Sequence, residues 1–532
     1  DFQTGKYIGR YYVADNVGVS DNNTTNYKTQ LNGRLQYETT IAQNHNIGAM
    51  FVYSEEYWHT RSTGASRNDR IHPSTSEINS ALTNVQSNSG SSASEGLRSY
   101  IGRMNYSAYD KYLLEFSFRV DGSSKFIKGH QYGFFPTVAV GWRFTEEEFL
   151  KKYLSSWLSS GKLRASWGKL GDNSGVGRFE QLETLTAMNY MSSDVVKGFV
   201  NKKMINKDLS WEVSTDINVG LDLGFLNNRL RTEIDFYNRL RTGMNRPSQM
   251  SIHLTGAYSA PRANIGDLLN RGLELNLTWK DKIGNVEYSV NLNGAYNRTV
   301  LKEWNEFLSR GWVYLDMPYH FLYVYENNGI AQTWQDIYNN TPQGLSPGDV
   351  IRKDLNGDGI IDGKDKKAYP NIQRDRPTTT YGITLQAAWK GFDISMLFNG
   401  GLGRKDFWLT DFNNTAFADR RYASTWDHWT EPWSLENRGG EWPRLGTSTD
   451  RSDNSYWLYN MNYLRMKNIM LGYNLPKKLL SKISMTNLRI YASAENLFTV
   501  TQYPGLDPEK KNSARDLYPI NRSFSIGLNV SF

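Results

Sequence analysis

The segment 354–365 has the residue types and the spacing of a calcium-binding loop. Oxygen-bearing side chains stand at positions 1, 3, 5, 9 and 12 of this stretch, and position 6 is glycine. Carboxylates crowded into so short a loop repel one another unless a hard dication takes their oxygens. We therefore predict one structural Ca²⁺ here. Its expected ligands are Asp354, Asn356, Asp358, the carbonyl of Ile360, Asp362 directly or through water, and Asp365.

The alternative interpretation of the same segment is an Asn/Asp/Gly turn of a kind common in loops. Position 12 is Asp365 where calcium sensors have glutamate, and the flanking residues lack helical periodicity. A fixed structural ion is therefore favoured over a signalling switch. Chelation distinguishes an ion site from a simple turn.

Other chemistry has little support in the sequence. There is no cysteine, and the seven histidines are scattered without an HExxH spacing. No phosphate-binding GxxxxGK[ST] occurs, and Glu146 to Glu148 are interpreted as a solvated acidic face. The net charge of +7 is spread over 532 residues without long basic blocks, which gives nucleic-acid binding little support. We expect a protein that is not an enzyme.

The last ten residues show what kind of element must carry these loops. Phe524, Ile526, Leu528 and Val530 alternate with small polar residues, and a period of two places the large apolar groups on one face of a strand. A second strand, 112–126, alternates in the same way but carries charges on its other face. We predict that the apolar face meets lipid and that the polar face, which includes Ser525, Gly527 and Asn529, meets a wet lumen.

Loop lengths separate a membrane barrel from a soluble sandwich. Short connections, such as Asn227 with Asn228, alternate along the chain with long ones, such as 300–377 and 403–460. Tight turns on one rim and long extracellular loops on the other are typical of outer-membrane barrels. We predict one all-β architecture over 1–532, without a linker that would divide it. The expected strands are 4–15, 27–41, 45–58, 98–109, 112–126, 134–146, 161–171, 210–225, 229–243, 271–280, 285–299, 378–390, 391–402, 461–476, 487–501 and 523–532.

The long loop 403–460 is rich in tryptophan. Such side chains could stack on sugar rings or grip peptide side chains in a vestibule. We favour the alternative, in which they pack the loop against itself or against a partner. The tryptophans are Trp408, Trp426, Trp429, Trp433, Trp442 and Trp457.

Several segments resemble the SusC/RagA-type TonB-dependent transporters of Bacteroidota. The stretch 463–476, YLRMKNIMLGYNLP, and the last hairpin, with AENLF at 494–498 and YPGLDPE at 503–509, are similar to that family's C-terminal strands. Upstream, RVDGSSKF at 119–126 and LRASWG at 163–168 resemble further family stretches in the expected order. Residues 1–97 match only in pattern.

This resemblance implies a transmembrane antiparallel β-barrel in the outer membrane. The family barrel has about 22 strands, of which this chain would hold about the last sixteen. The plug domain and the segment that contacts TonB would lie on an N-terminal half that this chain lacks. Because open strand edges are not tolerated in lipid, that half or another polypeptide must complete the barrel.

The resemblance also implies a function, which is the active import of oligomeric nutrients. The expected substrate is a glycan or an oligopeptide. The expected partners are a SusD-like surface lipoprotein over the long loops and TonB, and the barrel is expected to be embedded in outer-membrane lipid. One alternative is a transporter-like barrel recruited as a scaffold in a larger envelope complex. Another is a soluble calcium-binding β protein that acts on glycans, which the apolar alternation ending at Phe532 disfavours.

Overall fold

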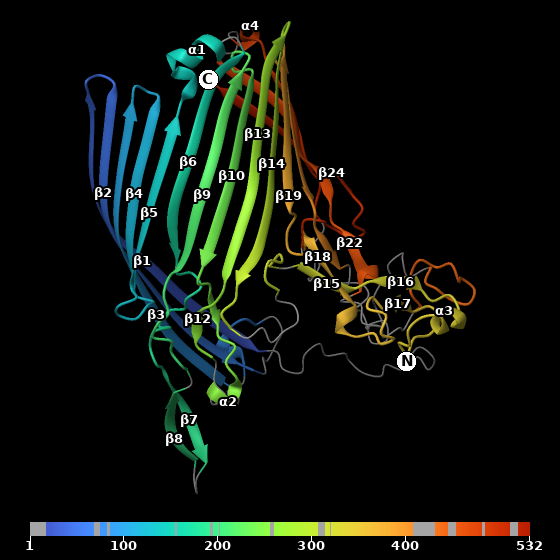
Figure 1. Cartoon of the computed structure of the whole chain (residues 1–532). Helices are drawn as coiled ribbons and strands as arrows, with labels where there is room; N and C mark the ends of the chain where they lie inside the picture. Colours follow the sequence, from blue (N-terminus) through green and yellow to red (C-terminus); the bar gives the residue numbers. More distant parts are fainter. Residues whose placement is uncertain are drawn as a thin grey trace.

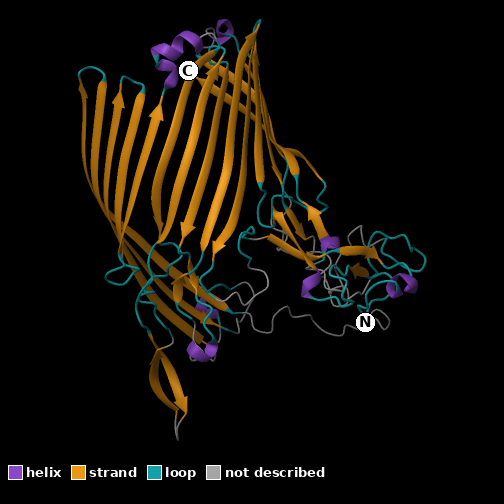
Figure 2. Ribbon diagram, in the orientation of Figure 1, coloured by secondary structure: helices purple, strands orange, loops and turns teal. Residues whose placement is uncertain are grey.

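The computed structural model describes residues 18–68, 75–81, 86–154, 157–191, 195–201, 203–255, 260–306, 314–319, 321–407, 431–444, 454–480, 485–510 and 520–532. Fifteen strands form one antiparallel sheet that curves into a wall (Figures 1 and 2). In spatial order, which is also chain order, they are β1 (Val19–Ile41), β2 (His45–Arg67), β3 (Gln86–Ala108), β4 (Tyr112–Ser123), β5 (Tyr132–Trp142), β6 (Leu158–Asp172), β9 (Glu212–Phe225), β10 (Leu230–Thr242), β13 (Asp267–Ile283), β14 (Val286–Glu303), β19 (Thr379–Trp389), β20 (Phe392–Leu402), β23 (Tyr463–Asn474), β24 (Asn487–Thr501) and β25 (Ser523–Ser531).

All fifteen strands coincide with strands expected from the sequence, and the sixteenth, 4–15, lies outside the described residues. The main difference is the length of the first three. Strands β1, β2 and β3 each have 23 residues. Their extensions toward the long-loop rim, such as 86–97, are rich in Ser, Asn and Gly, so apolar alternation did not mark them.

The turns at one rim are tight because their residues tolerate a left-handed backbone. Tyr109 and Asp110, and likewise Asn227 and Asn228, have positive φ at successive positions. Such pairs match the twist of the flanking strands, and Asn and Asp adopt this conformation at low cost. At this same rim lie α1 (Glu148–Leu154), preceded by η2 (Phe144–Glu146), and α4 (Lys477–Leu480) (Figure 1).

The opposite rim carries the long connections, which contain the remaining elements. A lobe built from 321–378 and 403–407 with 431–444 and 454–460 lies beside the sheet at this end (Figure 1). The elements of this rim are η1 (Ile78–Ser80), β7 (Leu185–Met191), β8 (Val195–Asn201), β11 (Asn245–Pro247), α2 (Ile252–Thr255), β12 (Arg262–Asn264), β15 (Phe321–Tyr325), β16 (Asn327–Ile330), α3 (Trp334–Tyr338), β17 (Val350–Arg352), η3 (Gly363–Asp365), β18 (Lys366–Gln373), β21 (Lys405–Phe407), η6 (Ser455–Trp457) and β22 (Leu458–Asn460).

The two edges of the sheet are β1 and β25, each hydrogen-bonded on one side in the described part of the chain. Within that same part, no helix is long and apolar enough to span a bilayer. Hydrophobic residues lie on the outer face of the sheet, in the lobe, and in a smaller buried cluster of Phe126, Val176 and Leu209. Large apolar side chains such as Ile526, 87% exposed, stand uncovered on the sheet.

Candidate functional site

The register of the strands sorts their side chains onto two chemically different faces. On β4, Leu114 and Phe116 lie opposite Val140 and Val138 of β5, so the apolar rows of neighbouring strands coincide. From Glu115 onward the alternate row of β4 is polar or charged, with Ser117, Arg119 and Asp121. A sheet with one continuous apolar face and one continuous polar face is what a lipid-exposed, water-filled barrel requires.

The polar face carries ion pairs that join three strands. Arg164 of β6 donates to both carboxylate oxygens of Asp222 on β9, with Nη2 to Oδ1 at 2.7 Å, and to Asp235 on β10, with Nη1 to Oδ1 at 3.1 Å. A planar guanidinium that binds two carboxylates at once fixes its own position on the wall.

Gly220 of β9 makes this arrangement possible. It lies between the strands that carry Arg164 and Asp235, and a Cβ there would come within 2.7 Å of the guanidinium carbon of Arg164. The same device recurs near the end of the chain. There Arg489 donates to Asp393, Nε to Oδ1 at 3.1 Å, across Gly472. In both places a glycine lets an ion pair lie flat against the backbone.

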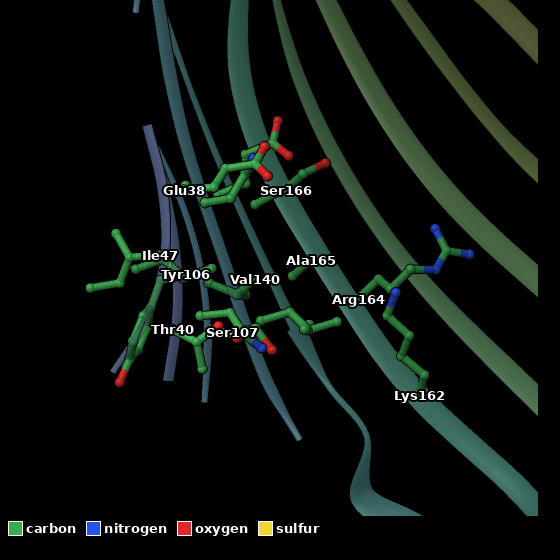
Figure 3. A pocket seen from close by; sticks show the side chains of 18 of the residues that line it. Glu38, Thr40, Ile47, Tyr106, Ser107, Val140, Lys162, Arg164, Ala165 and Ser166 are labelled. Carbon is green, nitrogen blue, oxygen red and sulfur yellow. Dashed lines mark hydrogen bonds between the residues drawn. The ribbon is translucent and has the colours of Figure 1, made fainter. Parts of the chain in front are cut away.

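A hollow of about 840 Å³ lies against this polar face. Most of its lining side chains belong to the polar rows of β1 to β6 and β9, so the polar face is the concave one. Lys162 and Arg164 extend from β6 at one side of it (Figure 3). The polar residues that line it are Glu38, Thr39, Thr40, Asn46, Asn105, Tyr106, Ser107, Glu115, Lys162, Arg164, Ser166 and Asn218. Such a wall is suited to contact with a polar, hydrated surface.

The lobe at the long-loop rim has its own hydrophobic core. Its buried members include Leu322, Val350, Phe407 and Trp457, and Trp442 packs against them with its ring 6.5 Å from that of Trp457. Trp433 is also buried, and its Nε1 donates to Oε1 of Gln332 at 2.9 Å. The favoured interpretation of the tryptophans as packing groups is confirmed for these three. Trp408, Trp426 and Trp429 lie outside the described residues.

Two buried arginines fix the lobe and β23 to the loop 503–510. Arg404 donates to the carbonyl oxygens of Pro508 and Lys510, each at 3.1 Å. Arg465 pairs with Asp507 at 2.8 Å and with Glu509 at 2.6 Å. The cationic groups of both side chains are thereby satisfied at 2% and 3% exposure. The YPGLDPE segment is therefore a structural tie between the last strands and the lobe.

The residues of the predicted calcium loop are brought into one turn, which is closed by backbone donors. Asp354 accepts from the N–H of Gly357 at 2.6 Å and of Gly359 at 2.8 Å. Burial disfavours the charge of Asp354, but these donors outweigh that effect and lower its pKa. Asp365 is fully buried and accepts from Leu355 and Asp362, at 2.9 and 2.8 Å.

The remaining predicted ligands bind one another or nearby backbone. Asn356 donates to Asp358, which also accepts from the N–H of Ile360, and Asp362 caps η3. In the described chain, no three His, Cys, Asp or Glu side chains are arranged to hold a metal. The loop therefore reaches its conformation with protein donors, and calcium binding stays a prediction from its spacing.

Sequence reasoning did not single out the ion pairs of the polar wall. Arg164 and Asp222 were visible as charges in strand patterns, but their meeting depends on the register of non-adjacent segments. One acidic residue interpreted as solvated is in fact bound. Glu147 accepts from Tyr112 Oη at 2.6 Å and from Trp142 Nε1 at 3.2 Å, whereas Glu146 and Glu148 are exposed as expected.

Known proteins resemble this chain over most of its length. A family model described as TonB dependent receptor-like, beta-barrel, matches residues 2–497. TonB-dependent receptor P3 of Formosa agariphila is 30% identical over 476 residues, which are 82% of this chain and 45% of that protein. TonB-dependent receptor SusC of Bacteroides thetaiotaomicron is 30% identical over 456 residues, which are 82% of this chain and 44% of that protein.

Among solved structures, the RagAB peptide transporter superposes with a TM-score of 0.81 at 22% identity. The match covers 96% of this chain and 56% of that one. At this identity the likeness concerns the fold alone. The chain spans about half the length of the relatives it matches.

Proposed function

Because this chain belongs to the TonB-dependent receptor-like β-barrel family, we propose that it forms part of an outer-membrane transporter that imports oligomeric nutrients, either glycans or oligopeptides. Its place in the outer membrane follows from the family and from its SusC- and RagA-like relatives. The soluble alternative is thereby removed. The proposal concerns the activity of the whole protein, of which this chain supplies a barrel wall and its loops.

The observation that carries the proposal is the chemistry of the concave face. A rigid wall of paired charges, with Arg164 bound between Asp222 and Asp235, presents polar groups in fixed positions to whatever fills the lumen. A movable domain inside the barrel would contact this wall without burying unpaired charge, which favours reversible docking. In the corresponding mechanism, TonB acts from the periplasm to move this domain, and its movement opens and closes the lumen.

We further propose that the partner of this protein is a SusD-like lipoprotein at the cell surface, and the features of the lobe support this proposal. The lobe is a folded unit with a hydrophobic core, tied to the barrel by Arg404, and it carries exposed apolar side chains. Trp334 and Tyr338 of α3 are 56% and 77% exposed. Aromatic groups on a rigid support suit a protein interface. A protein described as a peptide transporter shares the fold, but neither that description nor the wall chemistry separates peptides from glycans.

Uptake assays test this function. Cells in which the gene is deleted should lose accumulation of labelled oligosaccharides or labelled oligopeptides, while accumulation of the corresponding monomers persists. Dissipating the proton gradient should abolish the same uptake in wild-type cells. Undiminished uptake of every oligomer tested, together with recovery of the protein in a stable envelope complex, would instead support the scaffold alternative.

A further inference from the structure

One connection at the short-loop rim, between β5 and β6, is longer than a tight turn and contains a helix. The connection between β5 and β6 runs through η2 and α1 and has an amphipathic helix with exposed aromatic side chains. Phe149 is 63% exposed and Tyr153 is 75% exposed. Being four residues apart, they lie on the same side of α1. On another side, Leu150 and Leu154 are half-buried against the protein.

Contacts of the connection show that it folds over the apolar face of the sheet. Glu147 accepts hydrogen bonds from Tyr112 and Trp142, which belong to the same outward row as Leu114 and Val140. At its other end, Trp157 stacks on Phe225 of β9 with ring centroids 5.8 Å apart and an interplanar angle of 21°.

The ring of Phe144 covers Gly161 of β6, where a Cβ would meet it at 2.3 Å. Gly161 and Phe225 both lie in outward rows of their strands, since Leu163 and Leu221 pair in the same row. The connection therefore lies on the lipid side of the wall and does not turn into the lumen. The exposed side chains of this connection extend the apolar outer face of the sheet at the short-loop rim.

We propose that α1 and the residues around it dock on the periplasmic leaflet of the outer membrane, with Phe149, Tyr153 and Trp157 inserted at the lipid interface and Lys152 bound to phospholipid phosphate. Leu226, 51% exposed in the β9–β10 turn beside Trp157, extends the same patch. Aromatic rings with lysines beside them are the side chains that settle at membrane interfaces.

The two lysines of α1 are predicted to differ. Lys152 is three residues from Phe149 and so lies next to the inserted side of the helix. Lys151 instead pairs with Glu146, Nζ to Oε2 at 3.7 Å, on another side. Lysine on the inserted side can extend its alkyl stem along the apolar surface and leave its ammonium group at the phosphates. Lys151 therefore serves as the matched control.

Site-specific fluorescence tests the proposal, and these 532 residues supply no competing cysteine. Tyr153→Cys, labelled with an environment-sensitive fluorophore in the intact protein, is reconstituted in phosphatidylethanolamine–phosphatidylglycerol liposomes. Lipids with a nitroxide near the headgroup should quench this label strongly, and lipids with a nitroxide at the chain end should quench it weakly. Gln335→Cys, exposed in α3 of the lobe, should be quenched by neither, and Ile526→Cys should be quenched by both.

Adding Lys152→Glu should reduce headgroup-region quenching at position 153, whereas Lys151→Glu should leave it unchanged. Heat-modifiability on gels checks that each variant is folded. Quenching at position 153 no stronger than at Gln335→Cys would overturn the proposal, and it would indicate that water or another protein covers the helix. Equal effects of the two lysine substitutions would overturn the assignment of Lys152 to phosphate.

Discussion

At the residue scale, the polar wall depends on glycines as much as on charges. Replacing Gly220 with alanine would place a Cβ at 2.5 Å from Oδ1 of Asp235 and at 2.7 Å from the guanidinium of Arg164. The ion triad must then shift or separate. Overpacking of this kind costs about 1 to 3 kcal/mol. We expect Gly220→Ala to unfold at a lower temperature in detergent, as measured by heat-modifiability on gels.

The control for this variant is Gly294→Ala on β14. A Cβ there meets only the carbonyl oxygen of Thr380 at 3.8 Å, an ordinary contact. Each substitution adds one methyl group to a strand, so a larger loss at Gly220 reports the crowding of Arg164 and Asp235. If Gly220→Ala and Gly294→Ala melt together, Arg164 is not held as described.

The loop 354–365 gives a second prediction at this scale, namely that it binds calcium as a structural ion. Binding would replace the hydrogen bond from Asn356 to Asp358 with coordination of the ion by both side chains. Addition of Ca²⁺ should protect the loop from proteolysis, with an affinity of about 10⁻⁴ to 10⁻³ M as in extracellular modules. Asp358→Ala should abolish this protection. A loop equally protected in chelator and in calcium would show that backbone donors suffice.

At the scale of the element, β25 tests the assignment of faces. Leu528 is 60% exposed and lies opposite Ile490 in the apolar row. Arginine there should cost about 2 to 4 kcal/mol near the middle of the membrane and should impair assembly. Ser525 lies in the polar row opposite Ser493, so Ser525→Arg is the matched control and should assemble normally. Asn529 is a poorer control because it faces Arg489. Equal assembly of both variants would contradict the orientation.

The loop 503–510 should respond to acid. Burial disfavours the charge of Glu509, but hydrogen bonds from Tyr463 and Asn399 and the charge of Arg465 outweigh it, so the pKa of this carboxyl lies below its usual range. A lowered pKa in the folded state stabilises the tie at neutral pH, and this stabilisation is lost as the pH falls through that pKa. Because the intrinsic exchange rate of amides itself falls in acid, protection factors are compared, and protection in 503–510 relative to that within β25 should fall as the pH is lowered. Glu509→Gln should remove most of that pH dependence.

At the scale of the whole molecule, the two rims should face opposite compartments. Tyr338 on α3 is 77% exposed, the side chain of Lys151 on α1 is 65% exposed, and α3 and α1 lie at opposite ends of the sheet (Figure 1). A membrane-impermeant maleimide added to intact cells should label Tyr338→Cys and leave Lys151→Cys, on the water-facing side of α1, unlabelled until the outer membrane is opened. A photo-crosslinker at Tyr338 should capture a surface lipoprotein. Labelling in the reverse order would invert the topology on which the partner and the helix proposals both rest.

The sequence alone determined the strands and the order of the turns. Lipid on one side of a strand and water on the other impose a period of two, which is a local pattern readable in 523–532 without any partner. Tight turns such as Asn227 with Asn228 are local too, because the backbone preference of these residues is their own. The same local information missed the long extensions of β1 to β3, whose Ser- and Gly-rich segments alternate weakly.

Only the tertiary structure decided which charges meet. Arg164, Asp222 and Asp235 come from three strands, and a shift of one residue in register would send one of them to the other face. The outward fold of α1 depends likewise on Tyr112 and Phe225, which are distant in sequence. The predicted calcium loop, 354–365, shows what a local residue pattern does not determine. The spacing of its residues predicted which oxygens could bind an ion. The direction of each side chain was set instead by backbone donors that compete for those oxygens, such as the N–H of Gly359. This balance of backbone geometry and hydrogen bonding cannot be derived from residue spacing.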